Sequence, residues 1–207
     1  MAAHRRVKSA PQRGSVTLEL ALALSVAFPL LLGTGGIGLA LGRTLQATEL
    51  TRDVSHMYAW GADFSQPGTQ LVASTLSQNF NLTSTGESVL LFSTVYVVQQ
   101  TDCTTAGLHN CPNLNLPVFT QRIALGNTTL FSSHLGTPPA NYIGSGGNIA
   151  LADYCQQASL VATGFNAVLT LAGGQSSTVV EGYFAMPDLA FLGVANSGGG
   201  YYARFLF

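Results

Sequence analysis

The sequence predicts an α+β protein in which one long N-terminal helix packs on a small, mostly antiparallel β head. Three observations predict it. A basic segment precedes a long apolar run, a one-sided apolar pattern continues that run to about residue 60, and β-branched and aromatic segments fill the C-terminal part. The expected organisation is a basic leader at 1–14, a membrane-spanning helix at 15–42, a helical stalk at 43–64 and a β-rich head at 65–207.

The composition limits the classes of protein that fit. Charged residues make up 8% of the chain, against roughly a quarter in an ordinary soluble domain. The formal net charge is −1, and four of the eight basic residues lie in the leader, so the chain offers no basic face for nucleic acid beyond its N-terminus. Hydrophobic residues reach 47%, which excludes a disordered chain.

The apolar run at residues 18–41 has the length of a membrane span. It holds one charged residue, Glu19, and as a helix it would extend ~36 Å, enough for a hydrocarbon core of ~30 Å. The apolar region of a cleaved secretory signal is usually ~7–15 residues and ends in an A-x-A-like site, so a retained, single-pass anchor is favoured. Because the basic leader precedes the run, the positive-inside rule places the N-terminus in the cytoplasm and the head outside.

Two features within the run bear on helix packing. Pro29 removes a backbone donor, so we expect a kink or a locally loosened helix there. Gly38 and Gly42 form a G-x-x-x-G pair, which allows close approach of a second helix, although small residues are common in membrane helices in any case. Gly33 also begins a G-x-G-x-x-G pattern, but the preceding segment is too long for one strand and no second βαβ unit follows, which argues against a dinucleotide site.

Glu19 lies one residue into the apolar run. A carboxylate within a span costs ~2.5–3.5 kcal/mol at the centre of the membrane and less near its surface. Two interpretations stay open. The side chain extends to the cytoplasmic interface without a further role, or it has a partner and a function.

Residues 13–19 read RGSVTLE, and together with the basic leader, Pro29 and the following LLLG they resemble the processing region of TadE-like proteins. These are type IV pilin-like minor pseudopilins of tight-adherence pilus machines. The resemblance covers residues 5–60. Leu20 departs from the aromatic residue that many pilin-like proteins carry after the glutamate.

The resemblance implies a pilin-like fold and specific roles for three residues. A prepilin peptidase would cut after Gly14, Ser15 would carry the new α-amine, and Glu19 would pair with the amine of a neighbouring subunit and set the stagger between helices. It also implies a bacterial inner-membrane location, with other pilin-like subunits and the inner-membrane assembly platform as further partners. Neither a cofactor nor catalysis belongs to this role.

The residues that follow predict a stalk and a sheet. Leu50, Val54, Met57 and Tyr58 form an apolar stripe that should pack on the head, and Gly61, followed by a proline at position 67, should end the helix. Segments 88–99, 117–125, 176–185 and 201–207 are the expected strands, while the pattern at 149–172 does not distinguish helix from strand.

The three cysteines leave alternatives open. Outside the cytoplasm, Cys103 and Cys111 would form a disulfide across a small polar loop. A metal site that adds His109 and His134 is the alternative, but the spacing matches no common zinc pattern. Cys155 would either replace one partner of the disulfide or stay buried.

No catalytic motif is present: the chain lacks G-x-S-x-G, H-E-x-x-H, a P-loop and C-x-x-C. The leading hypothesis is a non-enzymatic, membrane-anchored pseudopilin. The first alternative is a single-pass anchored surface or periplasmic binding protein unrelated to pili. The second is an anchored enzyme whose active site follows no known motif.

Overall fold

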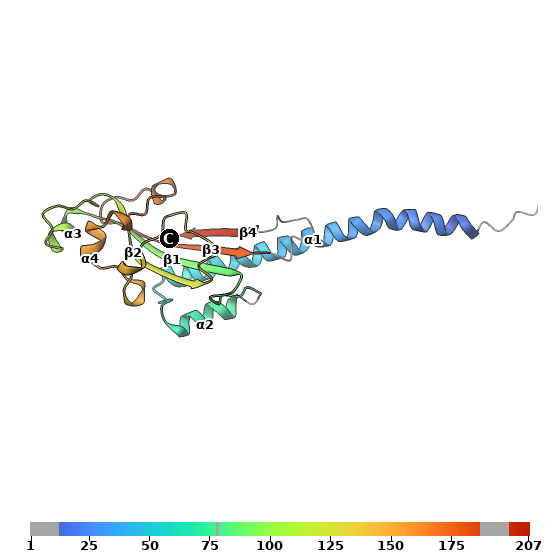
Figure 1. Cartoon of the computed structure of the whole chain (residues 1–207), viewed down its shortest axis with the longest axis horizontal. Helices are drawn as coiled ribbons and strands as arrows, with labels where there is room; N and C mark the ends of the chain where they lie inside the picture. Colours follow the sequence, from blue (N-terminus) through green and yellow to red (C-terminus); the bar gives the residue numbers. More distant parts are fainter. Residues whose placement is uncertain (1–12, 78, 187–198) are drawn as a thin grey trace, which may run out of the picture.

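A computed structural model describes residues 13–77, 79–186 and 199–207, with side chains from residue 16 onward. The predicted leader lies outside this part of the chain, apart from its last two residues. One long helix, α1 (Arg13–Ala59), extends from a β-rich head, which packs against only its C-terminal half (Figure 1). Its 47 residues give α1 a length of ~70 Å.

The head is built on a four-stranded antiparallel sheet with the strand order β2-β1-β3-β4. The four strands are β1 (Ser88–Val97), β2 (Pro117–Gly126), β3 (Ser176–Ala185) and β4 (Gly200–Leu206). Each predicted strand segment matches one of them closely. The predicted α+β class, with a long N-terminal helix packed on a small antiparallel sheet, is confirmed.

The C-terminal half of α1 packs on one face of this sheet and forms its main core. The predicted stripe supplies the contacts from α1, together with Ala47, and the alternating strand residues Leu90, Phe92, Val180 and Phe184 meet it from the sheet. Gly182 of β3 lies at the closest approach, because a Cβ built there would stand 2.6 Å from Thr51 Oγ1. A side chain at position 182 would force Thr51 and Phe184, or the helix itself, to shift.

The helix ends as the sequence predicts, and for a clear local reason. Gly61 has φ +90°, its N–H donates to the Tyr58 carbonyl at 3.0 Å, and the Ala62 N–H donates to the Met57 carbonyl at 2.9 Å. This is the Schellman motif, in which a left-handed glycine satisfies the last carbonyls of a helix. The last helical residue is Ala59, short of the predicted stalk boundary at 64.

Irregular chain covers the opposite face of the sheet. A second core lies there, made of Val95, Phe119, Leu135, Leu160, Phe165 and Val179. The segment whose pattern left helix and strand open folds as the short helix α4 (Leu151–Gln156) followed by two 3₁₀ turns.

The sequence did not predict two further helices of the head, α2 (Pro67–Leu76) and α3 (Gln100–Thr105). Pro67, taken as a residue that closes the stalk, instead occupies the first turn of α2, where its missing N–H costs nothing.

Candidate functional site: the exposed half of the long helix

The N-terminal half of α1 exposes an apolar surface on every side. Thirteen large apolar side chains between Val16 and Leu41 are 51–70% exposed, and three of them, Leu30, Leu31 and Leu32, are consecutive. A helix that is apolar all round is stable when lipid or protein surrounds it. In the part of the chain that the structure describes, α1 is the one helix long and apolar enough to cross a membrane, and it lies near the N-terminus.

Glu19 is the charged residue of this surface. Its side chain is exposed, and its carboxylate has no hydrogen-bond or ion-pair partner among the described residues. In a membrane, this carboxylate therefore has to reach the interface or find a partner outside the described residues.

Gly14 and Ser15, the predicted processing site, lie in the first turn of α1, directly before this exposed surface. Glu19 follows Ser15 by four residues, about one helical turn, on the same helix. The sequence thus places the predicted new N-terminus and the carboxylate on one continuous helical segment.

Pro29 does not interrupt α1, which continues without a break from Arg13 to Ala59. The exposed part of the helix nevertheless follows an arc in Figure 1. The hydroxyls of Ser25 and Thr34 are satisfied inside the helix, since Ser25 Oγ donates to the Leu22 carbonyl at 2.8 Å and Thr34 Oγ1 to the Leu30 carbonyl at 2.9 Å. They therefore place no unpaired polar group on the apolar surface.

Gly38 and Gly42 line a shallow groove with Asn79 of the head, and the described residues leave room beside both of them. A Cβ built on either of them, or on Gly33 and Gly35, meets nothing within 4 Å. The packing of the described residues therefore does not require glycine at these positions.

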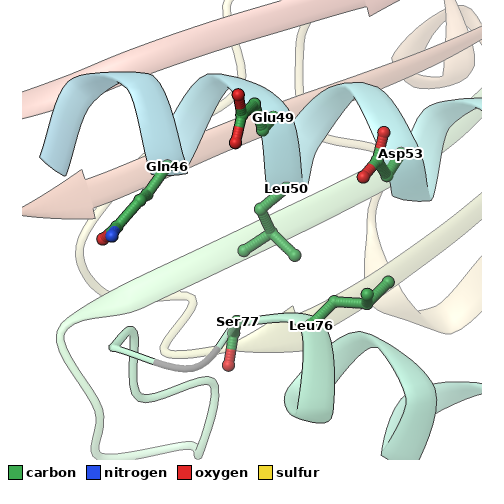
Figure 2. Close-up of a pocket in the computed structure, with 6 residues that line it drawn as sticks. All are labelled: Gln46, Glu49, Leu50, Asp53, Leu76 and Ser77. Carbon is green, nitrogen blue, oxygen red and sulfur yellow. The ribbon is translucent and has the colours of Figure 1, made fainter. Parts of the chain in front are cut away.

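A groove of about 200 Å³ lies where α1 enters the head, between α1 and the end of α2. Figure 2 shows Gln46 and Leu50 extending from α1 toward the segment that carries Leu76 and Ser77, while Glu49 and Asp53 lie along α1. The residues that line it offer carboxylates and an amide but no nucleophile paired with a base.

At the far end of the head, the structure pairs Cys103 with Cys111 in a disulfide, as the sequence predicts. Cys155 of α4 is buried and free, and the three sulfur atoms lie within 4.8 Å of one another. Among the described residues, this group of possible metal ligands includes neither His109 nor His134. The ring of His134 instead lies against Phe131 and Tyr202.

A buried ion pair that the sequence did not predict lies on the face of the sheet opposite α1. Glu181 of β3 is fully buried, and its Oε2 lies 3.9 Å from Nη1 of Arg122 on β2. The hydroxyls of Ser133 and Tyr202 and the backbone N–H of His134 also donate to this carboxylate. The signal was available, because Glu181 is the one charged residue of β3 and stands between Val179-Val180 and Tyr183-Phe184.

Burial shifts the proton equilibria of the groups around this pair. It lowers the pKa of Arg122 from its ordinary value, and the Glu181 charge opposes that shift. Burial and the same carboxylate raise the pKa of the Tyr202 hydroxyl. All of these groups have partners inside the head, so the arrangement holds the segment that carries Ser133 and His134 on the sheet.

Searches against models of protein families, against curated proteins and against solved structures gave no match to this chain.

Proposed function

We propose that this chain is a TadE-like pseudopilin, a non-enzymatic, membrane-anchored component of a tight-adherence pilus or a related secretion apparatus. Its place is the bacterial inner membrane, with the N-terminus in the cytoplasm and the head on the periplasmic or extracellular side. Its partners are a prepilin peptidase, other pilin-like subunits and the inner-membrane assembly platform.

The observation that carries the proposal is the division of α1 into two halves. One half buries a stripe of apolar residues against a sheet, and the other exposes large apolar side chains around its whole circumference. A single helix with this division suits a subunit that rests in a bilayer and later moves into a bundle of equivalent helices, because both surroundings cover an apolar surface.

Glu19 supports the proposal through its position. Cleavage after Gly14 would leave a positive α-amine on Ser15, near the carboxylate of an adjacent helix displaced along the common axis. In an apolar bundle the two charges would compensate each other, and the pairing would fix the stagger between subunits. The open Gly38 and Gly42 positions would allow neighbouring helices to approach closely in the same bundle.

The experiment that tests the proposal is intact-mass spectrometry of the protein extracted from the membranes of its own host. We expect a chain that begins at Ser15. A Gly14→Val variant should keep the leader, since the peptidase recognises the glycine, whereas the matched change Gly33→Val farther along the same helix should be processed normally. A full-length chain, or a cut after residue 41, would contradict the proposal.

A further inference from the structure

The three sulfur atoms at the far end of the head have no part in the proposed function. Cys103 and Cys155 are fully buried, and Cys111 is half-buried. Apolar residues surround the group, among them Val98, Val118 and Leu114. A free thiol held within 4.8 Å of both sulfur atoms of a disulfide is the arrangement from which thiol–disulfide exchange proceeds.

We propose that Cys103, Cys111 and Cys155 form a thiol–disulfide exchange site, in which the bridge moves between the Cys103–Cys111 pairing and a Cys111–Cys155 pairing. The Cys155 thiolate attacks Sγ of Cys111, a new sulfur–sulfur bond forms, and the bond to Cys103 breaks. Cys103 leaves as a thiolate and takes up the proton that Cys155 gave to solvent. The step conserves one disulfide and one thiol, so it needs neither an oxidant nor a reductant.

Hydrogen bonds favour Cys111 as the sulfur that is attacked, because they already hold its segment on α4. The Asn113 N–H donates to the Cys155 carbonyl at 3.3 Å, and Asn113 Nδ2 donates to the carbonyls of Tyr154 and Gln157, each at 2.8 Å. Asn113 is itself 1% exposed. The backbone around Cys111 and Cys155 would therefore keep its contacts in either pairing.

The leaving sulfur also has an acceptor in place. Cys103 Sγ lies 3.5 Å from the Gln99 carbonyl oxygen, which would accept the S–H that forms when the bridge moves. The buried thiol would thus replace the buried disulfide sulfur without leaving a donor unpaired.

The class of external reactant is a small thiol or the thiol of an oxidoreductase, and it would enter at Cys111. The other two cysteines are fully buried, so an external thiolate reaches the half-buried residue first. Its attack would form a mixed disulfide with Cys111 and release Cys103. Cys155 would then resolve the mixed disulfide by attacking Cys111 and expelling the external thiol.

The exchange should be slow at neutral pH and faster in alkali. Burial raises the pKa of the Cys155 thiol, and the Asp102 carboxylate raises it further, so little thiolate is present at neutral pH. Tyr96 and Tyr154, the other titratable groups beside Asp102, have pKa values raised to about 12 and stay neutral in this range. We expect the exchange rate to rise about tenfold from pH 7 to pH 8.

Non-reducing peptide mapping of the full chain in detergent micelles tests the proposal. Samples taken over time at each pH are quenched in acid, denatured, alkylated and digested, and the linked peptides are identified by mass. We expect a Cys111–Cys155 peptide, with alkylated Cys103, to accumulate and reach a plateau without added thiol, and to do so faster with reduced glutathione. Cys103–Cys111 as the only pairing at every time, or exchange that requires glutathione, would overturn the internal attack.

Two variants complete the test. Cys103→Ser should form an intramolecular Cys111–Cys155 bridge in a glutathione redox buffer, whereas the matched Cys155→Ser should keep Cys103–Cys111 and show no second pairing. Two free thiols in Cys103→Ser would count against the proposal. The map of the unaltered chain decides the matter independently if this variant does not fold.

Discussion

The two halves of α1 differ in what surrounds them. Between residues 16 and 41, large apolar side chains are exposed and Glu19 supplies the charge. Between residues 43 and 59, apolar side chains such as Val54 are buried against the sheet while Arg52 and Asp53 face solvent. One uninterrupted helix therefore serves two environments, and the side-chain pattern rather than the backbone marks the change between them.

Two glutamates differ in the same way as the two halves of α1: one is buried and the other is exposed. Glu181 is fully buried, Arg122 supplies its counter-charge, and three other residues of the head donate hydrogen bonds to it. Glu19 is exposed and has no side-chain partner among the described residues. The carboxylate of the head is thus partnered inside the head, whereas the carboxylate on the apolar half of α1 has no partner among the described residues.

The largest expected effect comes from Glu181→Ala, which leaves the buried Arg122 guanidinium without its counter-charge. We expect the free energy of unfolding to fall by about 3–5 kcal/mol. Denaturant titration of the full chain in detergent micelles, followed by far-ultraviolet circular dichroism, measures it. The matched change Glu87→Ala removes an exposed carboxylate and should alter stability by no more than about 0.5 kcal/mol. Equal effects of the two changes would refute the contrast.

A pair of leucine truncations compares the two halves of α1 directly. Leu50 is 4% exposed in the core of the head, whereas Leu31 is 70% exposed. Leu50→Ala should lower the free energy of unfolding by about 2–5 kcal/mol, because it leaves a cavity. Leu31→Ala should change it by less than about 0.5 kcal/mol. A comparable loss for both, in the same denaturant titration, would mean that the exposed half takes part in the fold of the head.

The smallest effect on the free energy of unfolding is expected from Tyr58, in the packed half of α1, when its hydroxyl ionises at high pH. Burial raises the pKa of Tyr58 to about 12, although the hydrogen bond with Thr94 opposes part of the shift. The folded pKa lies above the unfolded value of about 10, so this stabilisation is present below pH 10 and is lost as the pH rises through 12.

The raised pKa of Tyr58 should contribute no more than about 3 kcal/mol to the free energy of unfolding. Tyr58→Phe should therefore lose less stability between pH 10 and 12 than the unaltered chain, although it starts lower because Thr94 and Gln121 lose a partner. An unchanged alkaline slope in denaturant titrations at these pH values would show that other tyrosines carry the effect.

The sequence was sufficient to predict the parts of the fold that depend on local pattern. The stripe at Leu50, Val54 and Tyr58 packs on the sheet of the head, as its helical spacing predicts. The strands coincide with the β-branched and aromatic segments, and the Cys103–Cys111 disulfide closes the short loop that the sequence indicates. Each of these depends on residues that lie close together in the chain.

What was missed depends on contacts between distant residues or on very short elements. The strand order places β3 between β1 and β4, and the partnership of Arg122 with Glu181 follows only once that order is known. The helices α3 and α4 span six residues each, too few for an apolar period to show. The proline at the start of α2 is compatible both with the end of one helix and with the beginning of the next.

The roles of Gly14, Ser15 and Glu19 remain predictions, and the change Glu19→Ala tests the central claim most directly. The measurement is co-purification of the altered chain with other pilin-like subunits from the host, together with piliation and the mature mass. Glu49→Ala, which removes an exposed carboxylate from the packed half of the same helix, is the control.

If Glu19 pairs with the Ser15 amine of a neighbour, the Glu19→Ala chain is cleaved after Gly14 and inserts normally, but it no longer assembles. The reason is that a buried ammonium without its counter-charge costs about 3–5 kcal/mol. The Glu49→Ala control should assemble. Normal assembly and piliation with alanine at position 19 would contradict the account and would leave Glu19 as a side chain that merely extends to the membrane surface.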